Sequence, residues 1–573
     1  ISAWIAGPLR STLSTRLIGG GPPVTPSDVN GTLWFYWWAR QAMRDGKDLL
    51  HPDVICAPAG QALGSNFPQH VDAHMAGPFL SALPFPLSYN LFVLTVPVLG
   101  ALAAYAAVRV LGLGRILSLM VAALFGFNAF TMHELANGKP ASALVFTLPL
   151  VCAAWIRCLR APRRQFWPWM VMAGFAGALA IQQYVLYALI IAFFAAGVGL
   201  LHMIKPAPRV APARVIWAVV LVTGLATALS APYLSRLLGD RRPMPAFAEQ
   251  LRLQSPAVIR EQAESIDLSY PLWVDSDESL PRRAAFPAAL TVVGLLLLPV
   301  GGRRYRRWFA AAVGFYALSL GPMAAWAVRP EIEWFTVAGR GVPLPTWWLN
   351  KVFPFSIQFF HPCRVFPMVV LCAATAVGFG LQHIGRRRLG PAAGVIIAGL
   401  GLWQVQSAGG FHLLHTAYDP HPFIEQLADE PGDFAIIEFP VGLGHATAPA
   451  QLVHQKRRSE SHHDLVAQLR SGEPPEDCLT LPFLQALWDW SRPTPWTGPR
   501  PAPASAEPAA VHQAYRAGFR YLIAWRAGFD MLRQAGLDVD REQSIARLTS
   551  VLGPPLVSDD TLVAWAIPEM GRP

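Results

Sequence analysis

Two acidic side chains, Asp28 and Glu134, are the strongest candidates for chemistry in this sequence. Asp28 lies in "TPSDVNG", directly before a run of aromatic residues, and Glu134 lies in "TMHELANGK", at the end of an apolar run. A positioned carboxylate can act as a general base that takes a proton from an attacking hydroxyl. His133 and Asn137 stand beside Glu134 and are candidates for binding a substrate. Each acidic residue also has an ordinary alternative, because Asp28 could cap a helix and Glu134 could be a solvated loop residue.

Three basic side chains could supply the opposite charge. Lys351, His361 and Arg364 lie in "LPTWWLNKVFPFSIQFFHPCRVF", among many aromatic residues. A cation at the edge of a membrane can bind a lipid phosphate through its charge and its hydrogen bonds. The alternative is that these side chains simply reach from a helix end toward water.

The composition indicates that these residues belong to a membrane protein. Of the 573 residues, 53% are hydrophobic and 14% are charged, and the mean hydropathy is +0.34, whereas a soluble domain has about 25% charged residues. The net charge of +10 would suggest nucleic-acid binding in a soluble protein. Here most basic residues form short arginine clusters between apolar runs, which is typical of cytoplasmic membrane loops, so we do not expect nucleic acid as a partner.

Ten apolar runs approach the length of about 20 residues that a membrane-spanning helix needs. They cover residues 88–108, 115–132, 140–157, 166–181, 183–203, 214–236, 284–300, 308–328, 364–384 and 391–409. Arginine and lysine collect in alternate short connections, such as "RCLRAPRRQ", "GGRRYRRW" and "GRRRLG". By the positive-inside rule these connections are cytoplasmic, and the segments that face outside are 1–87, "HELANGK", 237–283, 329–363 and the tail from 410.

This topology predicts a multi-pass protein of the cytoplasmic membrane. No Asp, Glu, Lys or Arg lies in the middle of a run, which argues against a transporter and places any chemistry in the outer loops. The aromatic residues from Trp34 to Trp38 are then expected on a short helix at the outer headgroup layer. Because the chain begins with Ile1 rather than Met, we also expect a first span to be missing.

The composition changes near Phe411, where charged and polar residues become more frequent. The segments 434–441, 519–526 and 561–568 predict strands, and the segment 541–553 predicts an amphipathic helix that ends at Gly553. We therefore expect a mainly α, polytopic membrane protein with a small α/β domain. Its three parts are an outer segment 1–87 with a juxtamembrane aromatic helix, a membrane domain 88–409 and an extracytoplasmic domain 410–573.

The sequence gives little sign of metal or disulfide chemistry. The six cysteines have neither metal-ligand spacing nor a visible disulfide framework and are interpreted as small buried hydrophobic residues; they are Cys56, Cys152, Cys158, Cys363, Cys372 and Cys478. "ESHHD" has zinc-ligand residue types, but neighbouring side chains on a strand point apart, so a solvated loop is favoured. Asp72, between His70 and His74, lacks a fourth ligand. No metal site is predicted, and a divalent metal ion stays open as a cofactor.

Several longer stretches resemble a known group of membrane enzymes. They are "HPDVICAPAGQAL", "SYNLFVLTVPVLGALAAYAAVRVLG", "AALFGFNAFTMHELANGKPASALVFTLPLVCAAWIRCLR", "LPTWWLNKVFPFSIQFFHPCRVFPMVV", "FAIIEFPVG" and "AYRAGFRYLIAWR". Together they resemble GT-C glycosyltransferases, and most closely the bacterial group that includes YfhO-like proteins. The resemblance implies a polyprenyl-phosphate sugar donor, transfer on the outer face of the bacterial cytoplasmic membrane, a base or acceptor-positioning carboxylate at Asp28, and a second acidic residue at Glu134.

The sequence leaves two hypotheses about function open. In the first, the chain is a glycosyltransferase: a carboxylate takes the proton of the acceptor hydroxyl, and a cation such as Arg364 stabilises the departing lipid phosphate. In the second, the chain is a non-catalytic protein of the same fold that binds lipid-linked sugar during cell-envelope polysaccharide assembly. They differ in whether Asp28 or Glu134 must lie beside the reacting carbon.

Overall fold

A computed structural model describes most of the chain. The described residues are 13–20, 27–61, 63, 70–204, 212–239, 288–327, 333–337, 340–352, 362–385, 389–407, 413, 415–441, 444–459, 478–491, 508–534 and 539–569. His361, the "ESHHD" run and residues 240–283 of the predicted outer loop lie outside these ranges.

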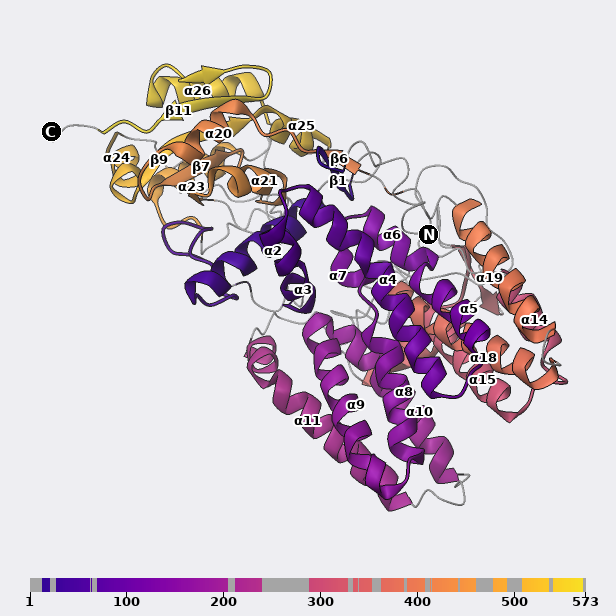
Figure 1. The fold of residues 1–573 in the computed structure, drawn as a ribbon. Coiled ribbons are helices and arrows are strands. Elements are labelled where there is room, and N and C mark those ends of the chain that lie inside the picture. The colour runs from indigo at the N-terminus through magenta and orange to yellow at the C-terminus, as the bar shows by residue number, and fades with distance from the viewer. Residues whose placement is uncertain are drawn as a thin grey trace.

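Helices make up most of the described chain (Figure 1). They begin with α2 (Ser27–Asp45), α3 (His70–Ala82), α4 (Leu87–Val110), α5 (Arg115–Gly126), α6 (Ala129–Ala136), α7 (Pro140–Ala143), α8 (Thr147–Arg160), α9 (Arg163–Gln183), α10 (Val185–Ile204) and α11 (Pro212–Gly239). They continue with α14 (Ala288–Leu296), α15 (Arg303–Ser319), α16 (Pro345–Val352), the short 3-10 helix η3 (Pro362–Val365), α18 (Phe366–Ile384) and α19 (Leu389–Ser407). Four short strands precede η3, namely β2 (Ala325–Ala327), β3 (Glu333–Trp334), β4 (Thr336–Val337) and β5 (Arg340–Gly341).

Within the described residues, six helical segments are long and apolar enough to cross a bilayer. They are Leu87–Val110, Arg115–Ala136, Pro140–Arg160, Ala213–Ser235, Pro362–Ile384 and Leu389–Ser407. The chain is therefore a membrane protein with several spanning helices, as predicted. Helices also stand at the other four predicted positions, but α14 has 9 residues and α15 has 17, fewer than the ~20 that a span needs.

One predicted run contains a helix break, and another has wrong boundaries. The run 115–132 breaks at Phe127, because the side chain of Asn128 accepts a hydrogen bond from the Thr131 amide at 3.0 Å and caps a new helix, α6. Glu134 is consequently carried by a short helix of its own. The run 308–328 is instead the helix α15, which is followed by Gly321 with φ of 83° and then by the strand β2.

The described residues of the arginine-rich connections lie at one end of the helices. Arg214 donates a hydrogen bond to the Ala161 carbonyl at 2.5 Å, which joins the start of α11 to the connection between α8 and α9. Gln382 of α18 accepts a hydrogen bond from the Gly114 amide at 2.8 Å. The opposite end of α4, which has 24 residues, is about 36 Å away at 1.5 Å per residue. This grouping agrees with the alternation from which the topology was predicted.

The C-terminal part contains a five-stranded mixed sheet in the order β10–β11–β9–β7–β8. Its strands are β7 (Ala435–Phe439), β8 (Arg457–Arg458), β9 (Phe519–Trp525), β10 (Val557–Ser558) and β11 (Leu562–Ala566). The helices around it are α20 (Pro422–Asp429), α21 (Gly444–His454), α23 (Pro482–Trp490), α24 (Pro508–Arg516), α25 (Arg526–Gln534) and α26 (Arg541–Leu552). One face of the sheet packs against α23, α24, α25 and α26, and the other packs against α20 and α21. The three predicted strands and the predicted helix are all present.

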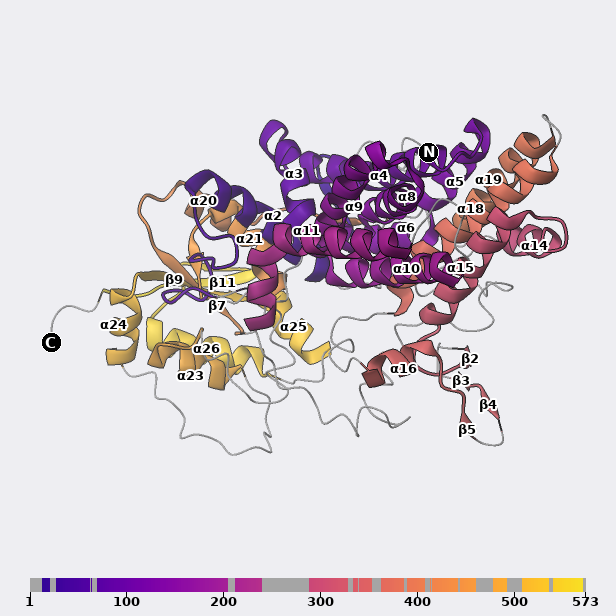
Figure 2. The same ribbon diagram turned by 90° about the horizontal axis from the view of Figure 1, so that it is seen from below.

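Helix α2 is buried between the membrane helices and the C-terminal part (Figures 1 and 2). Trp34, Tyr36 and Trp38 are each at most 1% exposed. Trp34 donates a hydrogen bond to Gln451 of α21 at 2.6 Å, and Tyr36 donates one to Asp72 of α3 at 2.5 Å. The expectation that these rings lie in the headgroup layer is therefore wrong, because both the rings and their polar tips have partners inside the protein.

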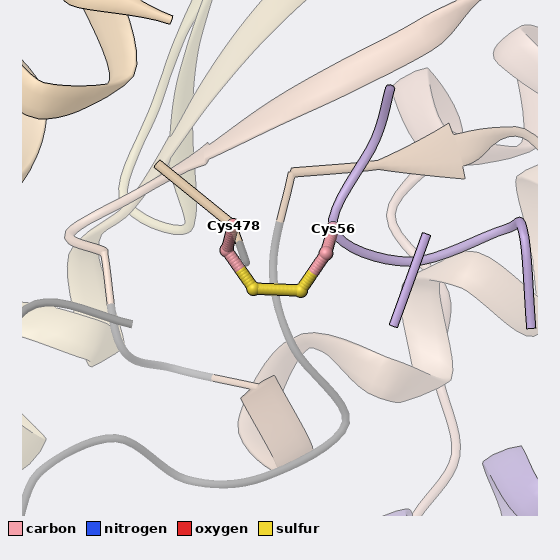
Figure 3. Close-up of a disulfide and its surroundings, with 2 residues drawn as sticks. All are labelled: Cys56 and Cys478. Carbon is pink, nitrogen blue, oxygen red and sulfur yellow. A yellow bond between two sulfur atoms is a disulfide. The ribbon is translucent and has the colours of Figure 1, made fainter. Parts of the chain in front are cut away.

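The N-terminal segment and the C-terminal part are joined at several points. The strand β1 (Arg16–Ile18) pairs in antiparallel fashion with β6 (His415–Ala417), and the Ala57 amide donates to the Arg458 carbonyl at 3.0 Å. Next to this contact, Cys56 forms a disulfide with Cys478 (Figure 3). The expectation that all six cysteines are small buried hydrophobic residues is wrong for this pair, since a separation of 422 residues leaves no local spacing to detect. The other four cysteines are buried, as expected.

The disulfide gives a first prediction. The variant Cys56→Ser/Cys478→Ser should lower the melting temperature of the purified protein, because a disulfide that closes a long loop typically contributes about 2–4 kcal/mol. Dithiothreitol should lower the melting temperature of the parent toward that of the variant and leave the variant unchanged. Peptide mapping without reductant should recover Cys56 linked to Cys478, and recovery of both as thiols would contradict the pairing.

Candidate functional site at the start of helix α2

Asp28 lies in the first turn of α2, where a negative charge is favoured by the helix dipole. Its carboxylate forms an ion pair with the Lys139 ammonium at 3.0 Å, and the Asp28 side chain is 41% exposed. The helix begins at Ser27, so Asp28 stands inside the first turn. The carboxylate is thus held on one side by Lys139 and remains accessible on the other.

A close approach of two backbones brings Lys139 to Asp28. Gly138 has φ of 73°, and a Cβ atom at this position would lie 2.4 Å from the Val29 Cβ and 2.7 Å from the Val29 Cα. The Thr32 hydroxyl donates to the Gly138 carbonyl at 3.0 Å and fixes the same contact. A glycine is therefore required here both for its backbone conformation and for its lack of a side chain.

Glu134 and its two predicted neighbours lie on α6 and just after it. Every residue of α6 is buried, and Glu134 is 2% exposed. Asn137 and His133 share a hydrogen bond of 2.6 Å between Nδ2 and Nε2, as expected for side chains four residues apart on a helical turn. The Asn137 Oδ1 atom is buried and has no hydrogen-bond partner among the described residues. It is an acceptor that a substrate hydroxyl could use.

Arg364 lies in η3, directly before the buried helix α18. Its guanidinium stands 4.7 Å from the centre of the Tyr184 ring, and it donates a hydrogen bond to the hydroxyl of the same tyrosine. Arg364 stands at the same end of the helices as Asp28 at the start of α2 and Glu134 on α6. The structure thus brings two carboxylates from separate segments and one arginine to one end of the molecule.

This arrangement combines two chemical capacities in one place. Asp28 and Glu134 are acceptors that could take or hold a proton. Arg364 presents a planar set of donors suited to a phosphate, and Tyr184 holds it from one side. The site lies at the end of the helices opposite to the arginine-rich connections.

The other predicted site residues have no described contact with Asp28, Glu134 or Arg364. Lys351 is exposed on α16, 5.3 Å and 5.4 Å from the ring centres of Trp347 and Trp348. His361 lies outside the described residues. Across the described ranges, no three His, Cys, Asp or Glu side chains are grouped as metal ligands.

Two residues of the site were not predicted from the sequence. Lys139 lies in "HELANGK", the predicted outer segment that also carries Glu134. Tyr184 directly follows α9, which ends at Gln183. A basic residue close in sequence to a candidate carboxylate was a usable signal for Lys139. Nothing local pointed to the pairing of Tyr184 with a residue 180 positions away.

Asp72 is a buried acid next to the site. Its carboxylate accepts the hydrogen bond from Tyr36, and its amide donates to Gln183 at 3.1 Å. His70 and His74 do not share its direction, because residues two apart on a helix do not face each other. Burial raises the pKa of Asp72 to about 7, even though the hydrogen bond from Tyr36 favours the charged form.

The raised pKa of Asp72 predicts a pH-dependent stability. The pKa of Asp72 is about 7 in the folded protein, above its ordinary value of 3.8. The protonated carboxyl group therefore contributes its full stabilisation of the folded state below about pH 4, and this stabilisation is lost as the pH rises through 7. Its upper bound is on the order of 4 kcal/mol. In Asp72→Asn this loss is absent. Between pH 5 and pH 8 the melting temperature should therefore fall further in the parent than in the variant, and equal falls would contradict the prediction.

The close contact at Gly138 predicts a stability difference between two glycine variants. Gly432 also has a positive φ, 106°, but no atom lies within 4 Å of an added Cβ. Gly432→Ala should lower the free energy of unfolding only through the strained backbone conformation. Gly138→Ala should lower it by about 1–3 kcal/mol more, because the added methyl group overpacks against Val29. Thermal unfolding of the two variants tests this, and equal melting temperatures would refute the required contact.

Among solved structures, two membrane-enzyme structures share this fold. The arabinofuranosyltransferase AftD from Mycobacteria matches with a TM-score of 0.51 and 15% identity over 99% of this chain and 40% of that chain. The oligosaccharyltransferase of Archaeoglobus fulgidus, in its apo form, matches with a TM-score of 0.50 and 11% identity over 95% of this chain and 71% of that chain. This chain spans about two fifths of the AftD chain. No protein-family model and no curated protein matches it. The chain thus shares the fold of these two structures, and the GT-C and YfhO-like assignments stay predictions.

Proposed function

We propose that the protein is an integral-membrane glycosyltransferase that moves a sugar from a polyprenyl-phosphate donor to an acceptor on the outer face of the cytoplasmic membrane. The observation that carries this proposal is that Asp28, ion-paired with Lys139 at 3.0 Å, lies beside the loop that follows the buried Glu134, at the same end of the helices as Arg364. Sugar transfer from a lipid phosphate needs a proton acceptor and a cation for the phosphate in one site. The shared fold with two glycosyltransferases adds support to the class of reaction.

The proposed step uses these residues as follows. The acceptor hydroxyl oxygen attacks the anomeric carbon, and its proton passes to the carboxylate of Asp28. The bond from that carbon to the phosphate oxygen breaks, and polyprenyl phosphate leaves with its negative charge on Arg364. Glu134 and the acceptor atom of Asn137 hold hydroxyls of the sugar, and His133 positions Asn137. Lys351 and His361 are proposed to bind the lipid phosphate, and a divalent metal ion stays open as a cofactor.

The outer location of this site is part of the proposal. Its first support is the grouping of the arginine-rich connections at the opposite end of the helices. Its second support is the disulfide between Cys56 and Cys478, because disulfides persist in oxidising compartments outside the cytoplasm. Both cysteines belong to segments that the charge pattern places outside.

The test compares variants of matched size. Asp28→Asn and Glu134→Gln each keep the shape of the side chain and remove its basicity. Sugar transfer should fall by about 10²-fold or more in Asp28→Asn, because this variant has lost the base. Asp433→Asn is the control, because Asp433 forms an exposed ion pair of 3.1 Å with Arg457 in the C-terminal part. The assay measures transfer from a polyprenyl-phosphate sugar by membranes that contain equal amounts of each protein.

The two hypotheses about function predict different results. Near-normal transfer by Asp28→Asn, with activity in the parent, would exclude Asp28 as the base. Absence of transfer by the parent across a panel of donors, with retained binding of the lipid-linked sugar, would instead favour the non-catalytic binding protein of the same fold.

A further inference from the structure

A second feature of the molecule begins at the end of the helices opposite to Asp28 and extends along α15. A cavity of about 810 Å³ lies between α8, α10, α15 and α18. Its wall is mostly apolar and includes Phe193, Phe194 and Phe379, and Phe194 packs 5.6 Å from the ring of Trp308. At one end the lining contains four arginines, namely Arg160, Arg303, Arg304 and Arg307.

These arginines stand in an unfavourable electrostatic setting. All four are exposed and line the same end of the cavity, and like charges so placed repel each other. Arg303, Arg304 and Arg307 also occupy the first turns of α15, where no acidic residue lies in the first turn and no side chain caps the helix. A helix N-terminus carries a partial positive charge that disfavours cations. Among the described residues, none of the four forms an ion pair with a carboxylate.

The positive-inside rule accounts for basic residues in the connection before α15, but it does not account for their position around an apolar cavity. An anion at this position would relieve the repulsion between the arginines and would also bind to the N-terminus of α15. The cavity extends from Arg303 to Leu318 and Pro345. Fifteen residues along α15 measure about 22 Å, which is most of the roughly 30 Å hydrocarbon core. The occupant must therefore combine an anionic head with a long apolar chain.

We propose that this cavity binds an anionic glycerophospholipid from the leaflet at the arginine end. Its phosphate lies on Arg160, Arg303, Arg304 and Arg307, and one acyl chain follows the apolar wall toward Leu318. Basic pockets between membrane helices on the cytoplasmic side suit such headgroups. A polyprenyl-phosphate donor does not fit this role, because a phosphate at Arg303 would be separated from the Asp28 site by the length of α15.

The headgroup is tested with the full-length protein in nanodiscs made from equal amounts of phosphatidylglycerol and phosphatidylcholine. Lipids that stay bound after transfer to detergent are measured by mass spectrometry. The parent should retain phosphatidylglycerol, and Arg303→Gln/Arg307→Gln should lower its retention by about tenfold or more, since each arginine contributes to the attraction. The matched control is Arg163→Gln/Arg164→Gln, which removes two exposed charges from the same end of the molecule but outside the cavity lining and should leave retention unchanged.

The acyl-chain path is tested separately. Gly314 lines the cavity, and no atom lies within 4 Å of an added Cβ, so Gly314→Leu should fill the path and lower lipid retention while the arginines stay in place. Gly399 of α19 has the same free space but does not line the cavity, and Gly399→Leu should retain the lipid. The proposal would be overturned if all four variants lost lipid retention equally, or if the parent retained phosphatidylcholine as well as phosphatidylglycerol. It would also be overturned if the retained lipid were a polyprenyl phosphate. Sugar transfer is not part of this readout, so its result is independent of the proposed enzyme activity.

Discussion

The burial of helix α2 is the constraint on which the rest of the structure depends. Trp34 and Trp38 are covered on all sides by protein, and full burial of such rings is strongly favourable. Because the indole of Trp34 donates to Gln451, the position of α2 is fixed relative to the C-terminal sheet. Because the hydroxyl of Tyr36 donates to Asp72, the same helix is fixed relative to α3 and the membrane helices.

The site follows from this constraint. With α2 held in place, the close approach at Gly138 sets the position of the "HELANGK" loop, and the loop carries Lys139 to Asp28. The preceding turn of the chain carries Glu134. Arg364 enters from a distant part of the sequence and is positioned by Tyr184. The molecule therefore has two charged ends, a mixed one with carboxylates and an arginine, and a purely basic one around the arginine-lined cavity.

The sequence was informative where a signal is local and uninformative where it is not. Periodicity and composition predicted the strands near 435, 519 and 562 and most membrane helices, because each depends on neighbouring residues. They did not separate an interfacial aromatic helix from a buried one, since both contain Trp and Tyr, and the partner of Trp34 lies 417 residues away. The disulfide and the Tyr184 contact were missed for the same reason. Asp28, Glu134 and Arg364 were candidates by residue type and by their predicted common side, and their role as one site stays a proposal.

The most direct test of the central claim is a structure of the nanodisc-embedded protein with a polyprenyl-phosphate sugar bound. We predict that the phosphate lies within about 4 Å of the Arg364 guanidinium, the usual limit for an ion pair, and that the anomeric carbon faces Asp28 and Glu134. A donor whose phosphate lies away from Arg364, with its sugar out of reach of both carboxylates, would contradict the proposed site.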